Sequence, residues 1–296
     1  MSIALAKNYI ALLDEVFAKA SVSVDLRGDI AFTREGANAK EIYYPEIEVK
    51  GLGDYSRTAG YPEGGVSVSW KAAEFNYDRG TKIQVDAMDN QETFDIAMGK
   101  AGAELQRTCV APEADAFTFS TLAGLTGVTA PAAADLANAA AFLSALRAAV
   151  NQFDNDEVPE TDRILYATPT LLNSLEDLDT TKSQKILEGF AKIIKVPQKR
   201  FISAIDLRSG RADDNNLGHY VPASGAKWLN FMLVYAPAVI KYDKHVTGNL
   251  IAPEDNQTAD AFLLKYRKYA IVDAYYNQRA GIYVHSSNTA ASFPSA

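Results

Sequence analysis

Hydrophobic and polar positions alternate along two stretches near the start of the chain. Residues 41–50, EIYYPEIEVK, have the composition of an extended segment, and Pro45 suggests a sheet edge. In residues 66–75, VSVSWKAAEF, every second side chain is apolar from Val66 to Ala72, as in a half-buried strand. Two such strands predict a hairpin roughly 30 Å long. A lone hairpin is marginally stable in water, so this one needs a surface to lie on.

The connection between the two strands is rich in glycine. It reads GLGDYSRTAGYPEGG, residues 51–65, and five of its residues are glycine. Two tyrosines, two carboxylates and one arginine stand among them. Glycine frees the backbone, whereas these side chains are suited to contacts. The pattern predicts a flexible tip that adapts to a neighbouring molecule.

Two helical patterns flank this hairpin. Residues 3–20 follow the 3.6-residue period, and they either pack on the chain's own core or form an arm on another subunit. After a predicted strand at residues 81–87, Asp89 has the character of a helix N-cap, with Glu92 three residues later. The apolar stripe of that helix includes Cys109, which we interpret as a small core residue.

Pro112 should kink this second helix or end it near Val110. If the helix resumes afterwards, it forms a rod of about 30 residues, roughly 45 Å long.

The middle of the chain predicts a small mixed lobe over residues 125–225. A linker of small residues leads to a helix, then to the short buried strand RILYA, residues 163–167, and Pro169 can open the next helix. Residues 206–225 are rich in turn formers and predict a long exposed loop. The strand-like segments that follow could return to pair with the first part of the chain, and the C-terminal tail looks loose.

Composition excludes several classes of protein. The chain has 296 residues, a hydrophobic fraction of 48% and a net charge of −8. It can therefore bury a core, and its acidity disfavours direct nucleic-acid binding, which relies on phosphate neutralisation. Cys109 is the only cysteine, so no disulfide forms within the chain. We find neither a signal peptide nor a membrane span, and expect a soluble protein made in a cytoplasm.

The sequence does not predict an active site. The histidines, His219, His245 and His285, lack the spacing of a metal site, and nucleophile and phosphate-binding motifs are absent. An EF-hand-like register starts at Asp177, but Lys182 stands where the turn needs glycine. We therefore expect no enzyme, no cofactor and no metal site.

Several long motifs carry a family resemblance. They are GLGDYSRTAGYPEGGVSVSW, NYDRGTKIQVDAMDNQET, AELQRTCVAPEADAF, AKWLNFMLVYAPAVIKYDKH and APEDNQTADAFLLKYRKYAIVDAYYNQRAGIYVHSS, and they occur in the family's order. The chain resembles the major capsid proteins of tailed bacteriophages with the Hong Kong 97-type fold. The middle of the chain matches that family in element order more than in residues.

The resemblance implies an α+β fold with four parts. These are an N-terminal arm (1–40), an extended E-loop hairpin (41–80), a peripheral domain with a long spine helix (81–124 and 226–296) and an axial domain (125–225). It also implies a set of contacts between subunits at the hairpin and its base, namely Tyr55, Arg57, Tyr61, Glu63, Trp70, Asp78 and Arg79.

The resemblance also implies partners. The chain would self-assemble as hexamers and pentamers into an icosahedral capsid, a virion shell assembled in the host bacterial cytoplasm around double-stranded DNA, which it encloses without reading its sequence. Residues 51–65 contain no lysine, so we expect no covalent cross-link from the tip. Because the strand region begins within about forty residues, we expect a separate scaffolding protein, and also a portal.

Two other functions remain open at this point. A cellular shell of the same fold, similar to encapsulins, would package a cargo protein that bears a docking peptide. A soluble enzyme would use the acidic clusters Asp213–Asp214 and Glu254–Asp255, in turn-like segments, to bind a metal. Metal addition would then shift its melting temperature well beyond that of a chelated control.

Overall fold

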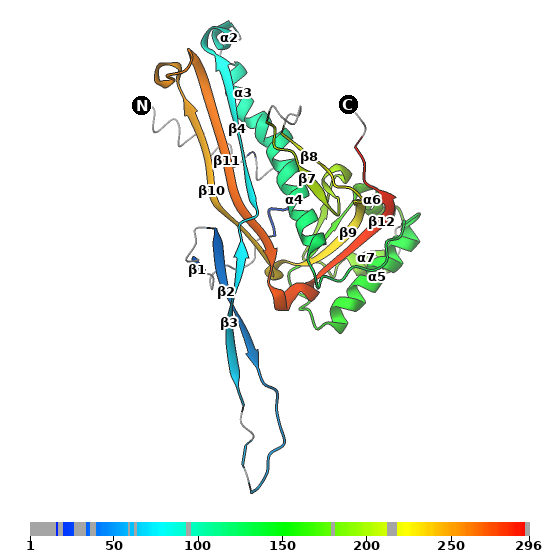
Figure 1. The fold of residues 1–296 in the computed structure, drawn as a ribbon. Helices are drawn as coiled ribbons and strands as arrows, with labels where there is room; N and C mark the ends of the chain where they lie inside the picture. Colours follow the sequence, from blue (N-terminus) through cyan, green and yellow to red (C-terminus); the bar gives the residue numbers. More distant parts are fainter. Residues whose placement is uncertain are drawn as a thin grey trace.

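The computed structural model describes most of the chain as two lobes with a projecting hairpin (Figure 1). The described residues are 16, 20–26, 34–35, 40–58, 60–61, 64–92, 96–178, 181–211 and 218–293. The helix expected at residues 3–20 therefore lies outside the described residues, apart from two positions.

The predicted hairpin is confirmed. Strands β2 (Glu41–Val49) and β3 (Val66–Glu74) run antiparallel, and Val49 pairs with Val66 at the far end. The short strand β1 (Arg34–Glu35) pairs with β2 near the base. The hairpin extends away from the rest of the molecule in Figure 1.

The first lobe is a three-stranded antiparallel sheet with a long helical rod. Its strand order is β10-β11-β4, formed by β10 (Val239–Ile251), β11 (Ala261–Ala274) and β4 (Tyr77–Asp86). The rod consists of α3 (Ile96–Leu105), the π-helix η1 (Gln106–Val110) and α4 (Ala111–Gly124), which follow one another without a break, and the short helix α2 (Ala87–Glu92) precedes it in the chain.

The structure corrects three details of these helices. The first helix begins at Ala87 and not at Asp89, because the Asp86 side chain accepts a hydrogen bond from the Met88 backbone nitrogen at 2.9 Å. Pro112 does not end the rod, because the proline lies in the first turn of α4, where a missing N–H is tolerated.

The third correction concerns Cys109, which is exposed and not part of the core. It lies within η1. A π-helical turn bonds residue i to residue i+5, so it shifts the apolar stripe relative to a regular 3.6-residue period.

The second lobe is built on a four-stranded sheet of order β12-β9-β5-β6. Its strand β5 is completely buried, as its sequence predicted, and Pro169 opens a helix as expected. The sheet strands are β5 (Arg163–Ala167), β6 (Lys192–Lys195), β9 (Lys227–Tyr235) and β12 (Ile282–Ala290); the helices are α5 (Ala139–Asn155), α6 (Pro169–Leu178) and α7 (Thr181–Leu187); β7 (Ile205–Leu207) and β8 (Tyr220–Pro222) form a small ribbon. Short 3-10 helices are η2 (Gln198–Arg200), η4 (Ala236–Ala238), η5 (Pro253–Asp255) and η6 (Tyr276–Gly281).

Sheet pairing divides residues 226–296, which the family resemblance assigned entirely to the peripheral domain. Strands β10 and β11 join β4, whereas β9 and β12 join β5. The fully buried β5 needs a hydrogen-bonding neighbour on each edge, and the apolar β9 supplies one. The domain limits themselves stay a prediction. The described part of the tail, which ends at Phe293, is also more ordered than expected, since Phe293 contacts Tyr220 and Trp228.

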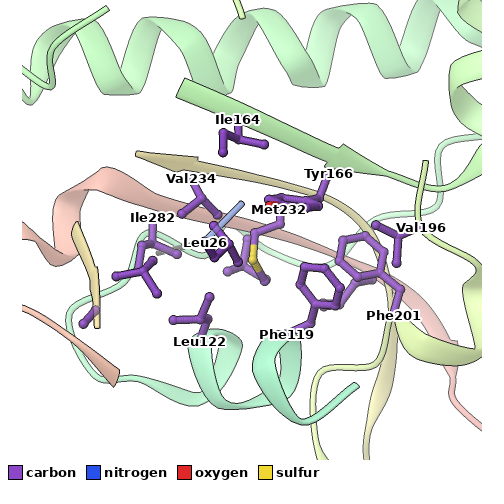
Figure 2. Packing of buried hydrophobic residues seen from close by; sticks show 14 of the residues in the cluster. Leu26, Phe119, Leu122, Ile164, Tyr166, Val196, Phe201, Met232, Val234 and Ile282 are labelled. Carbon is purple, nitrogen blue, oxygen red and sulfur yellow. The ribbon is translucent and has the colours of Figure 1, made fainter. Parts of the chain in front are cut away.

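Each face of the second-lobe sheet buries its own core. On one face, Tyr166 and Met232 pack with Phe119 and Leu122 of α4 (Figure 2). On the other face, strand residues pack against α5 and α6. Fully burying a large apolar side chain contributes roughly 1.5–3 kcal/mol, so the first core fixes the position of α4 and the second core holds α5 and α6 on the sheet.

Candidate functional site

The hairpin packs on its own chain only near its base. There Ile42, Tyr44 and Ala73 are buried in one cluster with Ile240 and Ile271 of the first-lobe sheet. These hairpin residues share one face of the ribbon, because directly paired residues point to the same side. The base of the hairpin is therefore held firmly by the body of the molecule.

Beyond the base, the apolar residues occupy the opposite face of the ribbon. Ile47 pairs with Val68, Val49 with Val66, and Pro45 with Trp70. We call Ile47, Val49, Val66, Val68 and Trp70 the hairpin stripe; these residues are between 46% and 67% exposed.

The face opposite the hairpin stripe is polar. Lys71 and Glu46 form an ion pair of 3.4 Å, and the Ser67 hydroxyl donates to Glu48 at 3.4 Å. The distal ribbon is thus apolar on one face and charged on the other, as expected of a strand pair that covers a surface.

The two strands cross in the view of Figure 1, because a two-stranded ribbon twists strongly.

The tip carries a pair of exposed aromatic rings. Tyr55 and Tyr61 are 60% and 87% exposed, and their ring centroids lie 4.9 Å apart. Backbone hydrogen bonds of 3.1 and 2.7 Å join Ser56 and Gly60, whose φ of 81° favours glycine. Arg57 is exposed at the turn. Of the predicted contact residues, Glu63 lies outside the described residues.

The two charged residues predicted at the base are engaged within the chain. Asp78 forms an ion pair of 2.7 Å with Arg267, whose hydrogen bonds lower the pKa of that carboxyl group. Arg79 binds both carboxylate oxygens of Glu113, at 2.7 and 3.1 Å, and donates to the Arg208 carbonyl at 2.8 Å. Arg79 therefore ties β4 to α4 and to the β7–β8 ribbon.

Sequence reasoning missed the two carboxylates at the start of α4. Glu113 accepts a hydrogen bond from the Tyr77 hydroxyl at 3.1 Å; burial first, and then this carboxylate, raise the pKa of Tyr77 well above its ordinary value. Asp115 is fully buried and pairs with Arg200 at 3.0 Å. Two acidic residues in one turn of an otherwise apolar helix, PEADAF, were the available signal.

Among the described residues, no three His, Cys, Asp or Glu side chains gather where they could hold a metal ion. His285 is buried and stacks on Phe231 with centroids 5.0 Å apart. Within this part of the chain, no helix is both long and apolar enough to cross a membrane.

Comparison with known proteins rests on structure. No family model matches the chain, and no curated protein matches its sequence. The capsid structure of cyanophage P-SCSP1u is similar with a TM-score of 0.59 at 13% identity, covering 92% of this chain and 89% of that one. A virus-like particle from Pyrococcus furiosus gives 0.58 at 12% identity, covering 93% and 96%. A structure from Mycobacterium phage Che8 gives 0.57 at 12% identity, covering 84% and 85%.

These similarities define the class of fold. The chain has the α+β architecture of the proteins that build phage capsids. It is the Hong Kong 97-type capsid fold, as the sequence motifs implied.

Proposed function

We propose that the chain is a major capsid protein, a viral structural protein that assembles as hexamers and pentamers into the icosahedral shell of a bacteriophage. The hairpin stripe carries this proposal, since a projecting ribbon with an exposed apolar face needs a second molecule to cover it. The similarity to capsid structures over most of the chain supports it.

The free energies of burial and association favour an assembly that is held together by many weak contacts. A buried valine or isoleucine contributes roughly 1.5–3 kcal/mol, whereas association costs about 4–15 kcal/mol in lost freedom of motion. One hairpin alone therefore holds a neighbour weakly. In a closed ring each subunit gives one hairpin and receives one, so the contacts reinforce each other.

The tip and the base of the hairpin would extend the same interface. The interface with an adjacent subunit would include four residues of the tip, Tyr55, Arg57, Tyr61 and Glu63. It would also include Trp70 of the hairpin stripe. At the base, Asp78 keeps 46% of its side chain exposed beside Arg267, which leaves room for a cation of the neighbour. Arg79 would contribute to the same interface indirectly, because its hydrogen bonds to Glu113 hold β4 in its orientation.

The shell would need further components. We infer a separate scaffolding protein and a portal, assembly in the host cytoplasm and a final location in the virion. A net charge of −8 suits a wall that encloses double-stranded DNA without gripping it. No enzymatic activity is part of this proposal.

Analysis of particle contents tests this function. The chain would be co-expressed with its neighbouring open reading frames, and particles would be purified after nuclease treatment. Protected double-stranded DNA supports the phage shell. A single cargo protein without nucleic acid would instead identify the cellular, cargo-packaging shell, which the similar structures do not favour.

A further inference from the structure

Among the described strands, β7 has a partner on only one of its two edges. Its ladder to β8 starts with a hydrogen bond to the Ala204 oxygen at 3.1 Å and ends with one from the Arg208 nitrogen at 2.8 Å. Every second residue of an antiparallel strand bonds to a given neighbour, so Asp206 also bonds towards β8. Ile205 and Leu207 therefore direct their N–H and C=O groups to the other edge.

This free edge borders a groove of about 410 Å³ beside α4. Phe117, Ser120 and Thr121 line the groove from the helix, and residues 204–207 line it from the ribbon, of which β7 is the strand that packs against α4. The volume is in the range of ordinary binding sites. A wall of backbone groups with apolar side chains at alternate positions is the kind of surface to which an extended strand adds.

Strand β6 has a second free edge, at the end of the sheet order β12-β9-β5-β6. Its sequence is KIIK, and Ile193 is 40% exposed. The side chains of Lys192 and Lys195 are 55% and 47% exposed, in ion pairs with Asp25 and Glu176. Exposed ion pairs are weak, so both lysines can change partners at little cost.

The two free edges are complementary in charge and in apolar character. Strand β7 presents the exposed Asp206 between the half-buried Ile205 and Leu207, whereas β6 presents two isoleucines between two lysines. Lysines on an edge strand discourage pairing with an identical edge. Opposite a carboxylate the same lysines favour pairing, so they select the β7 edge over a second β6 edge.

We propose that β6 of one subunit docks beside α4 of a neighbouring subunit and joins its β7–β8 ribbon as a third strand. Within one chain the two edges belong to different sheets, and they are different surfaces. The contact is therefore head-to-tail, and a head-to-tail contact generates a ring when its rotation closes. This inference rests on the proposed function and adds a contact between subunits that does not involve the hairpin stripe.

Cross-linking of the unmodified protein with a carbodiimide tests this contact, because the reagent joins a carboxylate directly to an amine that touches it. Equal amounts of ¹⁴N-labelled and ¹⁵N-labelled chains would be mixed, as concentrated subunits and as particles, and digested for mass spectrometry. The expected product joins Asp206 to Lys192 or Lys195, with one light and one heavy peptide.

Two controls accompany this measurement. Lys71 and Glu46 lie 3.4 Å apart within one chain, so their product should join peptides of the same isotope only. Asp206→Asn removes the reacting carboxylate and should abolish the mixed product. If no sample yields the mixed product while the control pair reacts, the contact between β6 and β7 is overturned even if shells form. A mixed product from a protein that never forms shells would support the contact and count against the proposed function.

Discussion

Ile47 and Val68 lie directly opposite each other on β2 and β3, and both residues are more than half exposed. Such a pair normally lies over a core. Here the chain's own core ends at the base of the hairpin, so the covering surface has to come from another molecule.

The hairpin stripe should be needed for assembly and not for folding. The double variant Ile47→Thr/Val68→Thr keeps β-branched side chains and introduces hydroxyl groups into the covered surface. Because both sites are exposed in the subunit, its free energy of unfolding should change by less than about 0.5 kcal/mol per site. Particle yield in sedimentation should fall sharply, while Ser67→Ala/Ser69→Ala on the polar face should assemble as the parent does. Equal yields from both double variants would contradict the role of the stripe.

Gly80 should be intolerant of a side chain. A Cβ at this position would lie 2.8 Å from the Tyr266 backbone oxygen, which the pairing of β4 with β11 holds in place. Gly80→Ala should therefore lower the free energy of unfolding by roughly 1–3 kcal/mol in urea titration. Gly51→Ala is the control, because a Cβ there meets nothing within 4 Å. If Gly80→Ala has the same urea midpoint as the parent, the close packing of β4 against the Tyr266 backbone is contradicted.

Asp115 should be a large contributor to subunit stability. Removing one partner of a buried ion pair leaves the other charge uncompensated and typically costs about 3–5 kcal/mol. Asp115→Ala should show a loss of this size in denaturant unfolding, whereas Asp54→Ala at the exposed tip should show almost none. A loss below 1 kcal/mol would mean that the hydrogen bonds around Asp115 are not maintained in solution.

His285 should make the free energy of unfolding sensitive to mild acid. Burial lowers the pKa of its imidazole below the ordinary 6.5, so the folded state binds this proton less readily than the unfolded state. The stabilisation is complete above the unfolded pKa and is lost as pH falls towards and through the lower folded pKa. Titration by nuclear magnetic resonance should find the pKa of His285 below 6.5, and His285→Gln should reduce the loss of stability between pH 7 and pH 5. A pKa at or above 6.5 would contradict the burial argument.

Elements whose formation depends on residues close together in the sequence could be predicted from the sequence. The alternation in residues 66–75 predicted β3, the apolar run RILYA predicted the buried β5, and Pro169 marked the start of α6. The hairpin tip was predicted by its glycines, and Tyr55 and Tyr61 are exposed there. The contacts of these tip residues with another subunit stay predictions.

Features that depend on distant residues could not be predicted in this way. Cys109 was misplaced because a π-helical turn changes the phase of the helix without a local sequence signal. The division of the last strands between two sheets depends on which partner each strand meets. The contact of Arg79 with Glu113 spans 34 positions, and no spacing rule connects the two. The expected contact of Arg79 with another subunit stays a prediction.

Electron microscopy of the purified, unmodified protein tests the central claim most directly. Negative-stain images, with particle sizing by light scattering, should show closed shells or rings of five and six subunits once the neighbouring open reading frames are co-expressed. A protein that stays monomeric with all of those partners present would contradict the proposal that this chain builds a shell.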